Sequence, residues 1–308
     1  MIVDNINGFS FDENANIYKV SKELRKLSDD EVLIKNTFVG LNPVDWKYVK
    51  RNNNIIGVDG VGIAVYSNDI RININARYAY HCNLEEDGSF ADYTIVKSKA
   101  LIPVPNYISD VVACSIPCPA LTAIQAIKKI PNLKNKNVVV NGSGGMVGKI
   151  LSSLLVDIGA NVYSIASDIH HKDLYDYGVL KCFNYNDVID INNLYCVFDT
   201  TGKADIFLNK ISYYGHIVSI LGRIENNNTS PFTTSVSLHE IALGAIYQYG
   251  SREDFEDLIS DGMYIFDLTA KNKILLSSIN VLDFDDIPDA LDRLKKGAKG
   301  IKFVARIN

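Results

Sequence analysis

The chain has 308 residues, of which 47% are hydrophobic and 22% are charged, and its formal net charge is −5 at pH 7. This is the composition of a globular protein with room for two domains, and the acidic balance argues against a general nucleic-acid-binding surface. The longest uncharged run, residues 111–127, contains two prolines and several polar side chains, which argues against a membrane span. Five scattered cysteines without a C-x-x-C pair, and no signal-peptide pattern, predict reduced thiols in a cytoplasmic protein.

Residues 1 to about 117 predict a β-rich, barrel-like domain, because short strand-like runs are separated by glycine and asparagine at irregular spacing. The expected strands are Glu31–Val39, Gly60–Tyr66, Ala76–Tyr80 and Phe90–Val96. Between the first two, Pro43 suits the first turn of a short helix. Asn42 is held extended by the proline that follows it and is expected to cap this helix.

A glycine-rich stretch follows a helix expected at Pro119–Ile127. Three consecutive valines, residues 138–140, indicate a buried strand. Four glycines then lead into an apolar-periodic segment that indicates a helix; they are Gly142, Gly144, Gly145 and Gly148. A strand, a glycine turn and a helix can place a diphosphate on the helix N-terminus, where free N–H groups and the helix dipole favour negative charge. The alternative interpretation is a strand-to-helix turn without a ligand.

Strands and helices alternate after this point, which predicts a doubly wound parallel sheet. Strands are expected at residues 161–166, 181–185, 194–199 and 216–221, with a helix at 172–177. A polar loop is expected at 223–232 and a helical or extended element at 235–249. The chain then predicts a helix at 252–262, a strand at 273–279, a helix at 287–296 and a last strand at 301–307.

These pieces in this order resemble the medium-chain dehydrogenase/reductase superfamily, and especially its zinc-free quinone (enone) oxidoreductase branch. The resemblance rests on Gly40–Lys47, Gly88–Val96, Pro117–Ala126, Val139–Gly148 and Arg293–Val304. It implies an α/β fold with a GroES-like domain at 1–117, completed by 282–308, and a Rossmann domain at 118–281.

The resemblance also implies a set of residues that contact a nicotinamide dinucleotide. They are Thr122, Ser143, Gly144, Gly145, Met146, Val147, Ser167, Tyr185, Thr200, Leu221 and Gly222. Ser167 and Tyr185 match two of the family's readers of the 2′-phosphate, so NADP(H) is favoured. NAD(H) stays open, because Asp168 has the spacing of the acidic residue that binds a ribose 2′-hydroxyl.

No metal site is expected, because the chain lacks the family's His-Glu pair near Gly57–Gly60 and its four-cysteine lobe, and tetrahedral zinc needs three or four convergent ligands. Without zinc, hydride transfer to an activated double bond needs a donor or cation at the carbonyl oxygen. The resemblance offers Asn42 and Lys47, with Tyr48 as a second candidate for the proton donor. Asn42 has an equal claim as a helix cap, and Lys47 as a solvated side chain.

The predicted function is therefore NADPH-dependent, zinc-independent reduction of a small quinone or α,β-unsaturated carbonyl, with no nucleic-acid or membrane partner and with a homodimer as the expected assembly. Many quinone reductases of the family carry a tyrosine near the position of Lys47, and this sequence does not. A dinucleotide-binding redox sensor or partner-binding protein with little turnover is therefore the alternative. A zinc alcohol dehydrogenase is a third hypothesis.

Overall fold

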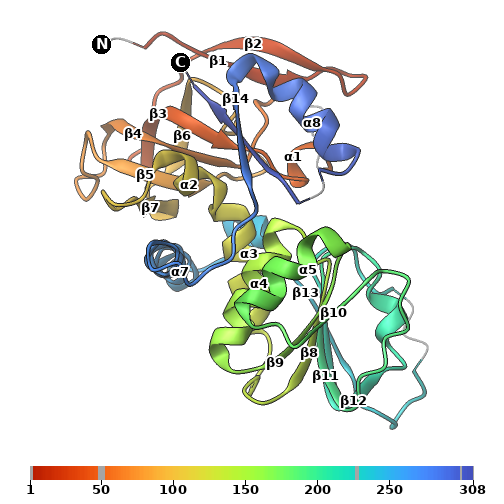
Figure 1. The fold of residues 1–308 in the computed structure, drawn as a ribbon. Coiled ribbons are helices and arrows are strands. Elements are labelled where there is room, and N and C mark those ends of the chain that lie inside the picture. The colour runs from red at the N-terminus through yellow and green to blue at the C-terminus, as the bar shows by residue number, and fades with distance from the viewer. Residues whose placement is uncertain (1–2, 48–52, 226–228, 299, 308) are drawn as a thin grey trace. The chain divides into compact units, whose positions relative to one another are not determined.

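The computed structural model describes residues 3–47, 53–225, 229–298 and 300–307. The chain divides into two compact units, which Figure 1 shows as ribbons. Unit 1 comprises Met1–Cys118, Gly244–Lys271 and Ser278–Asn308. Unit 2 comprises Pro119–Leu243 and Asn272–Ser277. Within the described ranges, no helix combines the length and the apolar character needed to cross a membrane.

Unit 1 is built on a mixed, mostly antiparallel sheet in the order β14-β15-β3-β4-β5-β7, with β6 paired to β3. Its strands are β3 (Glu31–Gly40), β4 (Asp59–Ser67), β5 (Arg77–His81), β6 (Tyr93–Lys97), β7 (Leu101–Pro103), β14 (Ile279–Asp283) and β15 (Lys302–Arg306). The separate hairpin β1 (Asn5–Phe11) and β2 (Ile17–Glu23) was not expected from the sequence. The last strand pairs antiparallel with β3, so the end of the chain completes the N-terminal sheet.

Unit 1 also contains helices, several of which pack on its sheet. They are α1 (Val44–Lys47), α2 (Asp110–Ser115), α6 (Ile246–Tyr249), α7 (Arg252–Ala270) and α8 (Ile287–Lys295). Ile287 and Leu291 of α8 join a buried cluster with Phe303 of β15 and Val39 of β3, and Figure 1 shows α8 beside this part of the sheet. Burial of such side chains is the main favourable contribution to folding.

Residues 244–271 belong to unit 1, whereas the sequence placed them in the Rossmann domain. The reason is the packing of α7, which lies against β7 where Gly262 closely approaches Ile102. Its start is fixed locally, because Ser251 and Asp254 form a capping box. The helix runs to Ala270 and is longer than the predicted one.

Unit 2 contains a parallel sheet in the order β10-β9-β8-β11-β12-β13, and the predicted α/β fold class is confirmed. Its strands are β8 (Asn137–Asn141), β9 (Asn161–Ile165), β10 (Lys181–Phe183), β11 (Leu194–Asp199), β12 (Ile211–Ser219) and β13 (Ser237–Glu240). Val138, Val139 and Val140 of the central strand are fully buried, as expected of a parallel sheet covered on both faces.

Helices connect several of the strands of unit 2. Its helices are α4 (Met146–Ile158), α5 (His171–Tyr177), η2 (Asp168–His170) and η3 (Ala204–Phe207), and α3 (Pro117–Lys128) begins at the unit boundary. Gly159 and Gly178 end α4 and α5 in the left-handed conformation, with φ of 86° and 115°. α4 packs on β8 and β9 (Figure 1).

The predicted strand at 273–279 is wrong except for its last residue, because β14 begins at Ile279. The preceding segment uses its backbone N–H groups on α4 instead of a sheet neighbour. Leu275 N–H donates to Ser153 Oγ at 2.8 Å, and Ser277 N–H to Met146 Sδ at 3.2 Å. The segment therefore belongs to unit 2.

Gly148 is required by close packing inside the glycine turn. An added Cβ would lie 2.3 Å from the Gly142 carbonyl oxygen and 2.6 Å from Ser143 Cα. We predict that Gly148→Ala lowers the free energy of unfolding by about 1–3 kcal/mol, because backbone must move to admit the methyl group. Urea unfolding without added nucleotide measures this effect.

Gly145→Ala is the matched control. A Cβ there meets only the Gly142 carbonyl oxygen at 3.8 Å, and the φ of −81° suits any residue. Its stability is expected to stay within about 0.5 kcal/mol of the parent chain. Equal losses in the two variants would contradict the packing argument.

Candidate functional site

The predicted cofactor residues of unit 2 follow neighbouring strands at one edge of the parallel sheet. Asn141 ends β8 and pairs with Ile165 of β9 and with Asp199 of β11, which in turn pairs with Ser219 of β12. Because the strands are parallel, the turns that follow them emerge at the same edge. Crevices outside the carboxyl ends of such strands are where open α/β sheets bind ligands.

The glycine turn after β8 leads directly into α4. Gly142 has φ of 90°, a left-handed conformation that favours glycine. The N–H groups of Gly142 and Ser143 both donate to the Ile165 carbonyl, which ties the turn to β9. Gly145 is the N-cap of α4, and no side chain caps it. The first turn of α4 therefore keeps the N–H groups that an anion can use.

Two of the predicted contacts are enclosed by protein. Ser143 is fully buried, and its hydroxyl donates to the Val140 carbonyl at 2.7 Å. Gly144 lies under the His170 ring, because an added Cβ would be 2.3 Å from His170 Cδ2. Gly145 is exposed, and Met146 and Val147 are half-buried. The reachable part of this turn is therefore its last residue and the start of α4.

A buried carboxylate shapes the next turn along the edge. Asp199 accepts hydrogen bonds from the N–H groups of Thr201, Gly202 and Lys203. Thr200 donates its hydroxyl to the Asn141 carbonyl at 2.9 Å, so the turn is joined to the end of β8.

The turn after β12 lies beside the turn after β11. Gly222 has φ of 74°, and an added Cβ would lie 3.9 Å from Gly202 Cα, while Leu221 packs against Gly202. The structure thus brings together the glycine turn, Thr200, Leu221 and Gly222, which are far apart in sequence.

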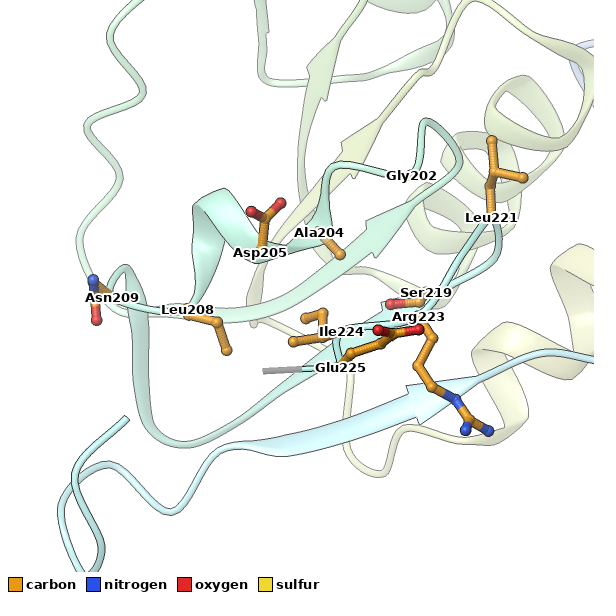
Figure 2. A pocket seen from close by; sticks show the side chains of 10 residues that line it. All are labelled: Gly202, Ala204, Asp205, Leu208, Asn209, Ser219, Leu221, Arg223, Ile224 and Glu225. Carbon is orange, nitrogen blue, oxygen red and sulfur yellow. The ribbon is translucent and has the colours of Figure 1, made fainter. Parts of the chain in front are cut away.

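A cavity of about 560 Å³ opens beside these two turns (Figure 2). Gly202 and Leu221 contribute to its wall, together with η3 residues and the segment after β12. Its charged lining residues are Asp205, Arg223 and Glu225. The volume lies in the range of small-molecule sites.

The residues expected to distinguish the two dinucleotides follow β9 and the neighbouring strand β10. Ser167, Asp168 and Tyr185 are exposed, and Asp168 accepts a hydrogen bond from the Ile169 N–H at 2.9 Å. Burial lowers the pKa of His170, and the nearby Lys149 ammonium lowers it further.

Lys149 was missed by the sequence reasoning. It is buried in α4, and its Nζ lies 3.4 Å from Asp173 Oδ2. A lysine directly after the last glycine, inside an apolar helix, was the available signal.

Thr122 is 9% exposed and lies in α3, on the part of that helix assigned to unit 2. It belongs to a different element from the turns described above, and its predicted contact with the cofactor stays a prediction.

In unit 1, polar residues lie along one edge of four adjacent strands, β15, β3, β4 and β5. Lys302 begins β15, Asn42 follows β3, Asp59 begins β4 and His81 ends β5. Asp59 and His81 are direct partners in the antiparallel register, and Asp59 Oδ1 lies 3.0 Å from His81 Nδ1. All four side chains are buried.

The side-chain amide of Asn42 makes hydrogen bonds to its neighbours through both its nitrogen and its oxygen. Its amide nitrogen donates to the Gly40 carbonyl at 3.1 Å and to Asp59 Oδ2 at 2.8 Å, and its amide oxygen accepts from Lys302 Nζ at 2.7 Å. A substrate could receive a hydrogen bond from Asn42 only if one of these bonds were given up.

Lys47 is exposed at the end of α1, with its ammonium 5.2 Å from the centre of the Trp46 ring. The indole N–H of Trp46 is buried and has no hydrogen-bond partner among the described residues. Tyr48 lies outside the described residues. The catalytic roles assigned to Asn42 and Lys47 remain predictions.

Comparison with known proteins shows which proteins this chain resembles. No family model matches the sequence. A zinc-type alcohol dehydrogenase-like protein of Staphylococcus epidermidis is 25% identical over 247 residues, which are 70% of this chain and 71% of the relative. An NADPH-dependent alkenal/one oxidoreductase of Arabidopsis thaliana is 25% identical over 225 residues, which are 65% of this chain and 57% of that protein.

The structure of the quinone oxidoreductase from Coxiella burnetii matches with a TM-score of 0.82 over 99% of this chain and 100% of its own, at 19% identity. The likeness therefore includes both the N-terminal sheet with its C-terminal strand and the parallel sheet between them. These relatives and this structure agree with the resemblance to the medium-chain dehydrogenase/reductase superfamily.

One of these relatives is named a zinc-type protein, so the possible metal ligands of this chain must be tested. Among the described residues, one cluster has metal-ligand geometry: ligand atoms of Asp59, His81 and Cys118 lie within 4.8 Å of one another. The sequence reasoning missed this cluster, because only strand pairing brings residues 59 and 81 to the start of α3.

The donors around Asp59 argue against a metal ion there. Its oxygens accept from Cys118 N–H at 3.0 and 3.1 Å, from Asn42 and from His81, and the Lys302 ammonium lies 3.8 Å away. With the carboxylate so engaged, the cluster offers an imidazole and a thiol, fewer than the three or four ligands that zinc requires. With these donors and the Lys302 ammonium in place, the cluster does not fit zinc.

Asp45 is a second buried carboxyl group close to Asn42. Its carboxyl accepts from Asn42 N–H at 2.6 Å and from Val58 N–H at 3.0 Å, which fixes the turn that carries Lys47. Burial raises the pKa of Asp45 to about 8; the two N–H donors and Lys302 oppose this shift, and Asp59 adds to it. Asp45 is therefore protonated at neutral pH.

This pKa predicts a pH dependence of stability. The folded state holds a proton on Asp45 that the unfolded chain releases above about pH 4, so the contribution is full below about pH 4 and is lost as the pH rises to about 8. We expect Asp45→Asn to reduce the fall in unfolding free energy between about pH 5 and about pH 8, measured by urea denaturation.

Asp289→Asn, an exposed position on α8, is the matched control and should leave the pH profile unchanged. An identical pH profile for Asp45→Asn and the parent chain would show that Asp45 is ionised in the folded protein.

Proposed function

We propose that this protein is an NADPH-dependent reductase that delivers a hydride to a quinone or an α,β-unsaturated carbonyl compound. One observation carries the proposal: the parallel sheet brings an uncapped helix N-terminus and the turns after β11 and β12 to one edge. That edge combines an anion site with adjoining space for the rest of a dinucleotide.

The residues present fit a dinucleotide at this edge. The first turn of α4 would hold the diphosphate, because no side chain caps its N–H groups. Thr200, Leu221 and Gly222 would contact the half that carries the nicotinamide. When bound, the reduced nicotinamide supplies the hydride, and the protein's task is to bind, orient and stabilise charge.

The side chains after β9 favour NADPH. Ser167 is exposed at the strand end, and the Lys149 ammonium lies near His170, which follows three residues later. Asp168 opposes a 2′-phosphate by its charge. The NADPH-dependent relative named above supports the same choice.

Hydride addition to the β-carbon of an enone places negative charge on the carbonyl oxygen, which then needs a cation and a proton. We assign the cation to Lys47, because its ammonium is exposed on the turn that Asp45 fixes. The unpaired indole N–H of Trp46 is a second donor on the same turn. Asn42 acts as a positioning residue, because both of its amide hydrogens bind protein oxygens.

The engagement of Asn42 favours one alternative, a dinucleotide-binding sensor with little turnover. Such a protein would bind NADPH without transferring its hydride.

The predicted homodimer stays a prediction. Among the described strands, β13 pairs only with β12, so its other edge is unpaired and could add a neighbouring strand.

The cofactor proposal is tested by thermal unfolding with NADPH and with NADH at equal concentrations. A ligand at about 100 times its Kd adds about 2.7 kcal/mol to native-state stability, so NADPH is expected to raise the Tm more than NADH. Asp168→Asn should tighten NADPH binding by roughly tenfold, about 1.4 kcal/mol, because one charge opposite the phosphate is removed.

Asp168→Glu, which keeps the charge, serves as the control and should bind NADPH like the parent chain. A larger Tm shift with NADH than with NADPH in the parent chain would overturn the NADPH assignment.

The hydride-transfer proposal is tested by following NADPH oxidation with small quinones and enones. Lys47→Met is expected to lower kcat/KM by about 10- to 100-fold, because the transition state loses a cation at the carbonyl oxygen. Lys47→Arg should retain most of the activity, and the Tm shift caused by NADPH should be the same in all three proteins.

Full activity in Lys47→Met would remove Lys47 from the mechanism. NADPH binding without oxidation by any acceptor in the parent chain would favour the sensor.

A further inference from the structure

The buried polar residues along one edge of the unit 1 sheet form a row, Asn42, Asp59, His81 and Lys302. This row contains a negative charge that must be balanced. Asp59 is 0% exposed, and its neighbours in the row, Asn42, His81 and Lys302, are each 4% exposed. A carboxylate removed from water is strongly destabilising unless hydrogen bonds and an opposite charge compensate it. N–H donors from Cys118, Asn42 and His81 supply the hydrogen bonds, and Lys302 supplies a positive charge.

Lys302 is held in this position by the fold. It is the first residue of β15, which pairs with β3, and the Leu41 N–H donates to the Phe303 carbonyl beside it. Its Nζ lies 2.7 Å from the Asn42 amide oxygen and 3.8 Å from Asp59 Oδ2. Asn42 therefore bridges the two charged groups: it accepts a hydrogen bond from the Lys302 ammonium and donates one to the Asp59 carboxylate.

The same carboxylate is part of the cluster with metal-ligand geometry. Asp59, His81 and Cys118 offer one oxygen, one nitrogen and one sulfur within 4.8 Å of one another. This mixture suits borderline-soft divalent cations such as Zn²⁺ and Co²⁺. Cys118 is partly exposed, so an ion can reach the cluster from solvent.

We propose that the Lys302 ammonium is the resident cation of this cluster: it takes the electrostatic place of a divalent metal ion and keeps the cluster metal-free. The positive charge neutralises Asp59 and repels a second cation. Loss of this charge would leave Asp59 uncompensated beside an imidazole and a thiol. Lys302→Leu should therefore convert the cluster into a divalent-metal site. The proposal is independent of the hydride-transfer function, because it concerns metal binding alone.

The experiment is a titration of the purified full-length chain with Co²⁺ alone, with visible and near-ultraviolet absorption recorded. Cobalt bound to a thiolate gives a ligand-to-metal charge-transfer band. The parent chain and the charge-keeping variant Lys302→Arg should show no band. Lys302→Leu should bind about one Co²⁺ per chain with the band present, and Lys302→Leu with Cys118→Ser should lose it.

Thermal unfolding gives a second measurement. Zn²⁺ should raise the Tm of Lys302→Leu and leave that of the parent chain unchanged. Lys302→Gln, which keeps a polar head group without charge, is the second variant. If both neutral variants fold only when metal is added, the proposal stands, because the ion then replaces the missing charge.

Three results would overturn the proposal. The first is stoichiometric Co²⁺ with a thiolate band in the parent chain, which would show that Lys302 does not keep the cluster metal-free. The second is a folded Lys302→Leu or Lys302→Gln protein that binds no cobalt. The third is a failure of both neutral variants to fold with or without metal while Lys302→Arg folds.

Discussion

Both sites depend on an aspartate buried at the end of a strand. Asp59 begins β4 in unit 1, Asp199 ends β11 in unit 2, and both are 0% exposed. A buried carboxylate must collect hydrogen-bond donors, and each aspartate obtains them from chain segments far away in sequence. Asp199 binds the amide of Asn141 across the sheet and the turn that follows its own strand. Asp59 binds Asn42, His81 and the start of α3.

The two carboxylates differ in how their charge is balanced, and the difference suits two kinds of site. Asp199 is held by neutral donors, and the turns beside it leave the first N–H groups of α4 for an anion. Asp59 has the Lys302 ammonium beside it, so its row is internally compensated. A compensated row holds Asn42 and Asp45 in place and thereby fixes the short helix that presents Lys47. The first arrangement suits an anionic ligand, and the second holds a polar turn in a fixed position.

Local patterns predicted much of the fold. The three valines of β8, the glycine turn and the apolar face of α4 were identified because strand and helix periodicities are visible in short windows. Element ends were predicted less well, as residues 273–278 show. Their composition is typical of a strand, but their N–H groups donate hydrogen bonds to side chains of α4. Residues 244–271 were predicted as part of the Rossmann domain, whereas they group with unit 1, because α7 contacts β7 and this contact is a property of packing alone.

The sequence by itself determined the order of elements, the resemblance to the superfamily and the glycine turn, because these depend on neighbouring residues. Only the tertiary structure decided which polar residues meet. Residues 42, 59, 81, 118 and 302 share no local pattern. Strand order and register bring 59, 81 and 302 to one edge, and hydrogen bonds to Asp59 join the turn at 42 and the start of α3 to them. The same pairing shows that Asn42, predicted from its turn as a donor to substrate, directs its amide hydrogens to Gly40 and Asp59. A side chain's chemical type is written in the sequence, whereas its free hydrogen-bonding capacity is fixed by its neighbours in space.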